Sequence, residues 1–130
     1  MSSNDPLANV LSHILNSEQK GKSECTIHPG SKVIRLILDL FKDHHYVGAY
    51  ETLDPERGIT LRINLLGAIN KCGVVKPRFS ITKHNYERYE KRFLPAKGFG
   101  ILVVTTSKGI MTHTDALKKG LGGKLLAYCY

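Results

Sequence analysis

VVTTSKGIMTHTDALKKGLGGKLL, residues Val103–Leu126, carries the clearest structural pattern in the chain. It opens and closes with aliphatic residues typical of buried strands, and Gly120 follows a short polar segment as glycine often follows a helix. The order predicts a strand at 99–106, a turn, a second strand, a short helix and a closing strand at 124–130. We therefore expect this part of the chain to be β-rich with short helices.

Upstream of this stretch the pattern alternates between helix and strand. Residues 5–20 have apolar side chains at helical spacing, with Asp5 as the expected N-cap and Gly21 at the helix end. A short strand, CTIHPG, should end at Pro29, and Ser31 should open a second helix, SKVIRLILDLFKDHH. The expected buried face of this second helix is formed by Ile34, Ile37, Leu38 and Phe41.

The segments YVGAYETL and GITLRINLL flank the turn sequence DPERG, which predicts an antiparallel hairpin with one face on a core. Helix, strand, helix and hairpin complete an amino-terminal two-layer α/β subdomain at residues 1–66. Residues 67–74 contain glycines and are expected to form a boundary segment. In the β-rich subdomain at residues 75–130, VVKPRFSI is expected to be a strand and HNYERYEKRF a helix. The sequence predicts an α+β fold.

Basic residues are concentrated in the second part of the chain. Residues 1–70 contain 7 Lys and Arg against 8 Asp and Glu, whereas residues 71–130 contain 12 against 3. A one-sided positive excess attracts polyanions, of which nucleic acid is the commonest in a cytosol. The alternative is a surplus of charge that serves solubility alone. If nucleic acid is the partner, the first residues of the basic part are candidate contacts, namely Lys71, Lys76 and Arg78.

Several classes of site are not indicated by the sequence. The three cysteines lie far apart without a C-x-x-C pair, so we expect buried thiols and neither a disulfide framework nor a zinc site. The six histidines have no metal-binding spacing and are interpreted as solvated or capping residues. KGFG and GLGG match no nucleotide-binding loop, so no cofactor is expected. Short apolar runs and the absence of a secretory pattern predict a soluble cytoplasmic protein.

A hydrolase is one interpretation of the opening stretch, because Ser107, His113 and Asp115 are the residue types of a catalytic triad. The expected elements place Ser107 in a turn and Asp115 in the first turn of a helix, where a carboxylate is favoured by the helix dipole. There is no G-x-S-x-G motif. We therefore predict no enzymatic activity and no small-molecule substrate. A small hydrolase remains the alternative from another functional class.

The second interpretation is a surface that binds RNA. Three consecutive hydroxyl residues, Thr105, Thr106 and Ser107, offer short hydrogen-bonding groups suited to base edges, ribose hydroxyls or phosphates. Hydroxyl residues are also common in turns for local reasons. The surrounding positive charge favours RNA binding, and it comes from Lys108, Lys118, Lys119 and Lys124.

The segment TTSKGIMTHTDALKKGLGGKLLAYCY resembles the carboxyl-terminal signature of the universal small-subunit ribosomal protein S-eight family. That signature is a hydroxyl triplet, Lys-Gly, an apolar residue and Met, a short helix, Gly-Gly and a final strand. The resemblance extends through DPLAN, HPGSKVI and NKCGVVKPRF, so it covers nearly the whole chain. INKCGVVKPRF and RFLPAKGFGI are similar to the archaeal and eukaryotic branch of the family rather than the bacterial one.

The resemblance implies a structural constituent of the small ribosomal subunit that binds the central domain of its rRNA and helps nucleate assembly beside neighbouring ribosomal proteins. It implies an RNA-binding loop with Met111 behind it, a Gly-Gly pair beside the RNA, and further positions near the RNA backbone in the amino-terminal subdomain. Carried onto this sequence, these positions are Thr105, Thr106, Ser107, Lys108, Gly109, Met111, Gly122, Gly123, Asn16, Ser31 and Lys32. A repressor that binds its own messenger RNA through the same surface is a further alternative.

Two residues depart from the pattern of bacterial family members. Lys124 stands where those members commonly carry Glu after the Gly-Gly pair, so a phosphate contact replaces any acidic role. The aromatic residue that bacterial members use near the boundary aligns only loosely with Phe79, and no stacking role is assigned to Phe79.

Overall fold

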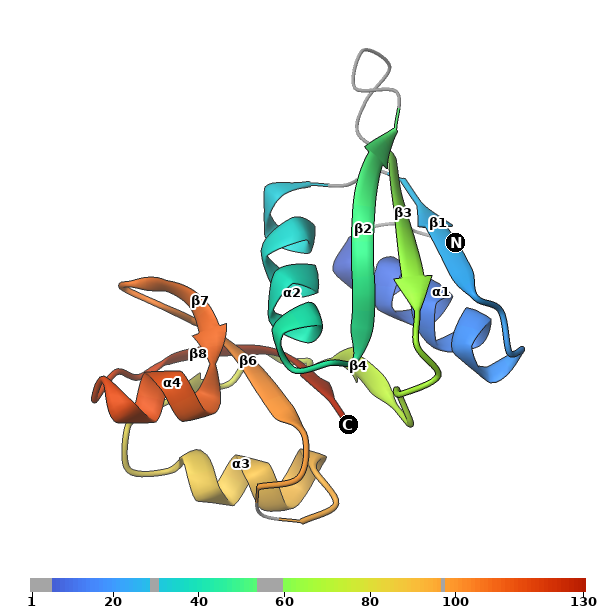
Figure 1. Ribbon diagram of the computed structural model, residues 1–130. Coiled ribbons are helices and arrows are strands. Elements are labelled where there is room, and N and C mark those ends of the chain that lie inside the picture. The colour runs from blue at the N-terminus through green and yellow to red at the C-terminus, as the bar shows by residue number, and fades with distance from the viewer. Residues whose placement is uncertain (1–5, 29–30, 54–59, 97) are drawn as a thin grey trace. The chain divides into compact units, whose positions relative to one another are not determined.

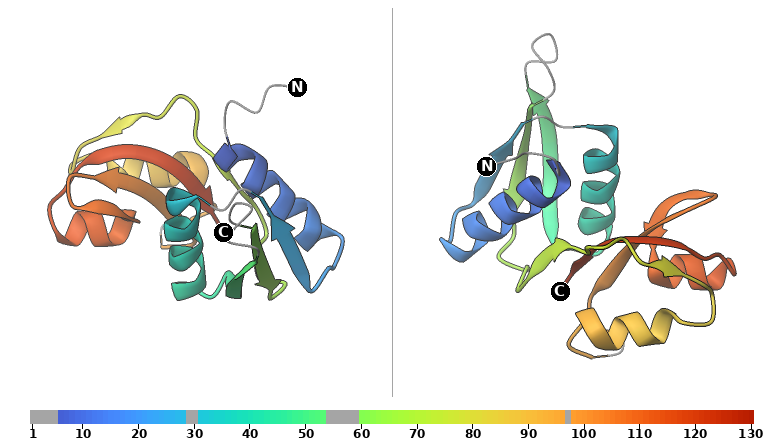
Figure 2. Two further views of the ribbon diagram at one scale, coloured as in Figure 1. Left: turned by 90° about the horizontal axis from the view of Figure 1, so that it is seen from above. Right: turned by 180° about the vertical axis from the view of Figure 1, so that it is seen from behind.

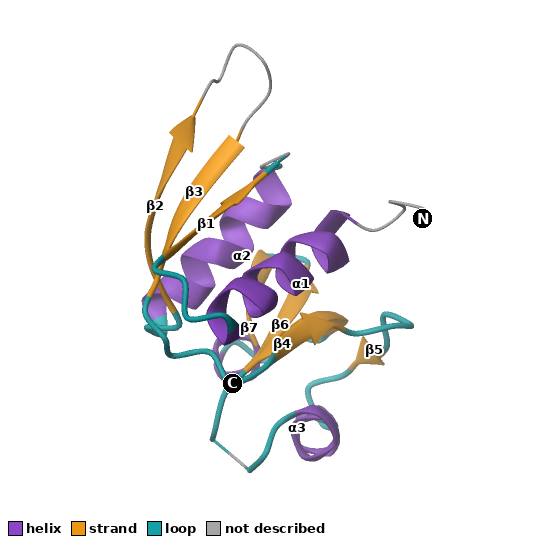
Figure 3. Ribbon diagram, turned by 90° about the vertical axis from the view of Figure 1, so that its right-hand side faces the viewer, coloured by secondary structure: helices purple, strands orange, loops and turns teal. Residues whose placement is uncertain are grey.

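The computed structural model describes residues 6–28, 31–53, 60–96 and 98–130 and divides into two units, Met1–Asn70 and Lys71–Tyr130. The described elements of the first unit are α1 (Pro6–Gln19), β1 (Glu24–Ile27), α2 (Lys32–Asp43), β2 (Val47–Leu53) and β3 (Thr60–Leu65). The strands form an antiparallel sheet in the order β1-β3-β2. Both helices cover the same face of this sheet (Figures 1 and 3). The predicted two-layer arrangement is confirmed.

The helices of the first unit form where the apolar spacing predicts them. The expected buried face of α2, with Ile34, Ile37, Leu38 and Phe41, is buried. The Ser31 hydroxyl caps α2 by accepting a 3.3 Å hydrogen bond from the Ile34 N–H. The first strand, β1, extends from Glu24 to Ile27. The expected N-cap Asp5, the strand end at Pro29 and the turn DPERG at 54–58 lie outside the described residues.

The second unit is built on an antiparallel sheet in the order β4-β8-β6-β7, with β5 also paired to β8. Helices α3 and α4 lie on one side of the sheet in the view from behind (Figure 2). The described elements of this unit are β4 (Cys72–Val74), β5 (Ser80–Ile81), α3 (Tyr86–Phe93), β6 (Ile101–Thr106), β7 (Gly109–Thr112), α4 (His113–Lys118) and β8 (Gly123–Cys129).

The prediction of one continuous strand for VVKPRFSI is wrong. The structure has two short strands instead, β4 ending at Val74 and β5 at Ser80–Ile81, and both pair with β8. Pro77 lies between them, and proline has no N–H to donate to a sheet ladder. Lys76, Pro77 and Arg78 are all exposed in the connection.

The core of the second unit lies between the sheet and the two helices. One face of the sheet contributes Leu102 and Val104 from β6, Met111 from β7 and Leu125 from β8, and the helices contribute Tyr86 and Ala116. The pairing of β6 with β8 shifts register between Val103 and Val104, so Leu126 has no partner residue on β6. This bulge lets Leu125, Leu126 and Ala127 all be buried, where simple alternation would expose one of them.

The α+β fold class predicted from the sequence is confirmed by these two mixed units. The division into subdomains at residues 1–66 and 75–130, with a boundary segment at residues 67–74, stays a prediction. All three cysteines are buried thiols, and burial raises the pKa of Cys25. Among the described helices, none combines the length and apolar composition that crossing a membrane requires.

Candidate nucleic-acid interface

Residues Thr105–Gly109, which we call the hydroxyl turn, include the end of β6, the connection and the first residue of β7, and are held by their own hydrogen bonds. The Thr106 hydroxyl donates to the carbonyl oxygen of Gly109 at 2.8 Å and accepts from the N–H of Lys108 at 3.1 Å. Its single proton is therefore used inside the turn. Ser107 and Lys108 are exposed at the tip. Thr106 accordingly shapes the turn, and the side chains offered to a partner are those of Thr105, Ser107 and Lys108.

A line of side chains crosses the sheet next to the hydroxyl turn. Thr105 is directly opposite Ile110 on one side and Lys124 on the other, and Lys124 is directly opposite Ser80. Directly opposed residues in an antiparallel ladder project from the same face. Because Val104 and Met111 face the helices, this set faces the other way. Ser80 and Lys124 are exposed, and Thr105 and Ile110 are half-buried. We call this set, Ser80, Lys124, Thr105 and Ile110, the cross-strand row.

The Gly-Gly pair has a role inside the protein. A Cβ on Gly123 would overlap the carbonyl oxygen of Thr105, and a Cβ on Gly122 would overlap the carbonyl oxygen of Ile81. Only glycine lets the start of β8 approach both neighbouring strands this closely. The pair thus determines how Lys124 and Thr105 are placed beside one another. Contact of these glycines with RNA stays a prediction.

The segment that follows the hydroxyl turn is held by the burial of Met111 and by caps at both ends of α4. Met111 is 6% exposed, and its sulfur lies 4.0 Å from the Thr106 hydroxyl. Helix α4 is capped by Thr112, whose hydroxyl accepts from the Asp115 N–H, and the helix is followed by Gly120 at φ 68°. The N–H groups of Gly120 and Leu121 donate to the carbonyls of Leu117 and Ala116, which closes the helix in a Schellman motif. Gly120 therefore ends the helix, in keeping with its place after the short polar segment.

His113 is not a solvated or capping residue, and this prediction is wrong. It is 1% exposed, and its Nδ1 accepts a 3.1 Å hydrogen bond from the N–H of Leu102. Its Nε2 faces Oε2 of Glu90 at 3.5 Å. Leu102 and Ser107 are separated by roughly 16 Å of extended strand, so the imidazole is engaged far from the Ser107 hydroxyl. The arrangement of Ser107, His113 and Asp115 is not that of a catalytic triad.

The remaining predicted contacts lie elsewhere. Lys76 and Arg78 are exposed just before β5, and exposed Lys71 exchanges two backbone hydrogen bonds of 2.9 Å with Tyr130. Asn16 and Lys32 are exposed on α1 and α2 of the first unit. Ser31 in that unit is the N-cap of α2, so its hydroxyl already has a structural role. The structure brings together the residues of the hydroxyl turn, Met111, Gly122, Gly123 and Lys124.

Sequence reasoning missed two members of the cross-strand row, Ser80 and Ile110. Ile110 could have been found, because a residue after the Lys-Gly turn must lie opposite one of the hydroxyl residues in a hairpin. Ser80 reaches the row only because β5 pairs with β8, which begins more than forty residues later in the chain. No local pattern predicts such a pairing.

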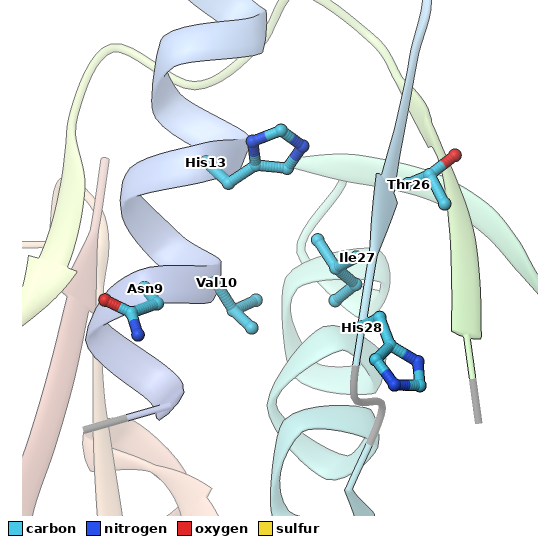
Figure 4. Close-up of a pocket in the computed structure, with 6 residues that line it drawn as sticks. All are labelled: Asn9, Val10, His13, Thr26, Ile27 and His28. Atoms are coloured by element: carbon cyan, nitrogen blue, oxygen red, sulfur yellow. The ribbon is translucent and has the colours of Figure 1, made fainter. Parts of the chain in front are cut away.

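The described residues contain no group of three or more His, Cys, Asp or Glu side chains arranged around a common point. A groove of about 240 Å³ lies between α1 and β1 in the first unit (Figure 4), with Val10 and Ile27 buried and the other four residues exposed. It is lined by Asn9, Val10, His13, Thr26, Ile27 and His28.

The chain matches the family model described as ribosomal protein S8 over residues 5–130. The match includes the hydroxyl turn, the Gly-Gly pair and both units of the structure. With all but the first four residues inside the match, the chain belongs to the ribosomal protein S8 family, whose members are structural, non-enzymatic constituents of the small ribosomal subunit.

Proposed function

We propose that this protein binds the central domain of small-subunit rRNA directly and helps nucleate assembly of the subunit, as a member of the archaeal and eukaryotic type of the family. The proposal is supported most by the cross-strand row beside the hydroxyl turn. Together they combine the exposed hydroxyl groups of Ser80 and Ser107 and the half-buried hydroxyl of Thr105 with the ammonium groups of Lys108 and Lys124 at one end of the sheet.

The chemistry of this surface suits irregular RNA. Thr105 and Ser107 are small enough to approach base edges and ribose hydroxyls in a bulge or internal loop, where bulky side chains would collide. Because the Thr106 proton is used inside the turn, the turn keeps its shape without help from a ligand. Lys108 and Lys124 are exposed and add an attraction to phosphates that weakens with salt. Hydroxyl groups thus provide selectivity, and lysines provide affinity.

The near-neutral first unit is proposed to contact neighbouring ribosomal proteins in addition to RNA. Its balance of 7 basic and 8 acidic residues offers no net attraction to phosphates. Cross-linking within assembled subunits would identify its neighbours. Cross-links from α1 and α2 to rRNA alone would contradict this part of the proposal.

Direct binding to a naked central-domain fragment of small-subunit rRNA tests the proposed function. Footprinting should show protection of one discrete helical region. Ser107→Ala should weaken binding by about 1 kcal/mol with an unchanged salt dependence, because it removes one neutral hydrogen bond. Lys124→Gln should reduce the slope of log K against log salt by about one, because it removes one phosphate contact.

Matched controls are available in the first unit. Ser12→Ala on α1 and Lys42→Gln on α2 remove the same groups from exposed positions. Neither change should alter binding. The proposal is wrong if no discrete region is protected, or if Ser107→Ala and Lys124→Gln cannot be told apart by their salt dependence.

A further inference from the structure

Five aromatic rings and one guanidinium form a continuous series of contacts in the second unit. Phe79 and Tyr89 have ring centroids 5.5 Å apart, and the Arg92 guanidinium lies 4.8 Å from the Phe79 centroid and 5.4 Å from the Phe93 centroid. Phe93 stacks on Tyr128 at 5.7 Å, and Tyr128 stacks on Tyr130 at 6.3 Å. We call these six residues the aromatic ladder: Tyr89, Phe79, Arg92, Phe93, Tyr128 and Tyr130.

The backbone around the ladder leaves room for its rings. Gly73 is directly opposite Tyr128 across β4 and β8, and a Cβ on Gly73 would lie 3.0 Å from the Tyr128 hydroxyl oxygen. A Cβ on Gly100 would lie 2.7 Å from the Cβ of Tyr130. The backbone of Tyr130 is held by two hydrogen bonds to Lys71. The positions of Tyr128 and Tyr130 are therefore fixed by the sheet and its glycines.

The ladder differs from the buried tyrosine of the same unit. Tyr86 is 2% exposed and donates its hydroxyl proton to the Leu121 carbonyl at 2.7 Å. The ladder rings are half-buried, and the hydroxyls of Tyr89, Tyr128 and Tyr130 make no hydrogen bond to a described residue. The five rings pack against the core of the second unit and are only half-buried. Tyr89 and Tyr130, at the two ends of the ladder, each have one ring neighbour in this series, so a further ring can stack at either end.

Charge favours RNA over protein as the partner. On α3, Glu87 lies 4.0 Å from Lys91 and buried Glu90 faces His113, so both acidic residues of the helix already have partners. Arg88 and Arg92 are exposed and form no ion pair with a described residue. The aromatic rings therefore lie beside the positive charges of Arg88 and Arg92, which no acidic side chain of the helix neutralises. The unit as a whole has 12 basic and 3 acidic residues. Aromatic stacking within a basic surface is the chemistry that binds unpaired nucleotides.

We propose that the aromatic ladder is a second RNA-binding surface that holds unpaired nucleotides by stacking, separate from the hydroxyl turn. Tyr128 is directly opposite Leu102, which faces the helices, whereas the cross-strand row projects from the other face of the sheet. Lys124 and Tyr128 are also separated by roughly 13 Å along β8. The two surfaces therefore contact different RNA segments, one structured and one single-stranded. Stacking on rings tolerates any base, so the ladder selects unpaired structure rather than sequence.

The test uses the full chain and a short oligoadenylate that contains 2-aminopurine, with binding measured by anisotropy and stacking by quenching of the 2-aminopurine fluorescence. We expect saturable binding with quenching. Tyr89→Leu should weaken binding about tenfold and reduce the quenching, whereas Tyr89→Phe should retain both. Arg92→Gln should weaken binding more than Lys118→Gln, a matched loss of one exposed charge on α4. Denaturant unfolding of each variant verifies that it is folded.

Several outcomes would overturn the ladder proposal. These are no binding of the oligonucleotide by the wild-type chain, equal losses in Arg92→Gln and Lys118→Gln, and an unchanged affinity in Tyr89→Leu. Reduced incorporation of Tyr89→Leu into subunits with normal oligonucleotide binding would assign the ladder to a protein partner and would also overturn it. Ser107→Ala should leave oligonucleotide binding unchanged while weakening binding to the central-domain fragment. The oligonucleotide measurement therefore tests the ladder proposal, and the measurement with the central-domain fragment separately tests the proposed function.

Discussion

The backbone N–H of Leu102 on β6 donates a hydrogen bond of 3.1 Å to Nδ1 of His113, the first residue of α4. Since Nδ1 accepts, the proton of the neutral ring lies on Nε2, which faces the Glu90 carboxylate on α3 at 3.5 Å. A single buried side chain thus connects the sheet with both helices of the second unit. The imidazole stabilises the fold that supports the hydroxyl turn.

We predict that His113→Ala destabilises the protein by about 3 kcal/mol, because it creates a cavity and leaves the Leu102 N–H and the Glu90 carboxylate without this partner. The free energy of unfolding from denaturant titration measures the loss. His84→Ala is the control, because His84 is exposed and lies two residues before the start of α3. A loss no larger than that of the control would contradict the structural role of His113.

The close approach of β8 to β6 predicts a strong effect of Gly123→Ala. The new methyl group would overlap the Thr105 carbonyl, so the strands must separate, and we expect a loss of about 2 kcal/mol or more. Gly73→Ala is a matched control in a neighbouring strand, where the new methyl group meets only the end of the Tyr128 side chain. Denaturant unfolding should rank Gly123→Ala well below Gly73→Ala in stability. Equal stabilities would show that β8 tolerates a wider spacing.

Adjacent threonines in the hydroxyl turn should respond differently to the same substitution. Thr106→Val removes the hydrogen bonds to Gly109 and Lys108, and we expect it to lower stability by about 1 kcal/mol. Thr105→Val removes a hydroxyl from the cross-strand row, where it has no partner among the described residues like those of Thr106, and should lower rRNA affinity with little change in stability. Thermal unfolding and rRNA binding of both variants measure the two effects. The assignment is wrong if Thr105→Val is the more destabilising change.

Tyr50 gives a test at high pH in the first unit. Burial, followed by a 2.8 Å hydrogen bond from its hydroxyl to Asp39, raises the pKa of Tyr50 from 10.0 to about 12. The folded protein therefore keeps this proton where the unfolded chain has lost it. The contribution to stability is fully present below pH 10 and is lost as the pH rises to about 12.

The comparison of wild type with Tyr50→Phe isolates this contribution, because the other groups that titrate in this range are common to both proteins. Between pH 10 and 12, the wild-type free energy of unfolding should fall more steeply than that of Tyr50→Phe. Parallel pH dependences would mean that Asp39 does not hold the proton of Tyr50.

The sequence alone determined the class of fold and the position of the candidate surface. Apolar spacing located α1 and α2, the aromatic and charged segment HNYERYEKRF located α3, and the hairpin pattern located β2 and β3. The hydroxyl triplet and the Lys-Gly turn located the β6–β7 connection. These features are local, because helix periodicity and turn chemistry depend on residues only a few positions apart.

Only the tertiary structure decided which side chains share a surface. The pairing of β5 with β8 brings Ser80 into line with Lys124, and contacts of α3 with Phe79 and with Tyr128 on β8 align the aromatic ladder. The burial of His113 likewise depends on Leu102 and Glu90, which are distant in sequence. Long-range pairing is selected by the packing of the whole sheet, so no short segment of sequence encodes it.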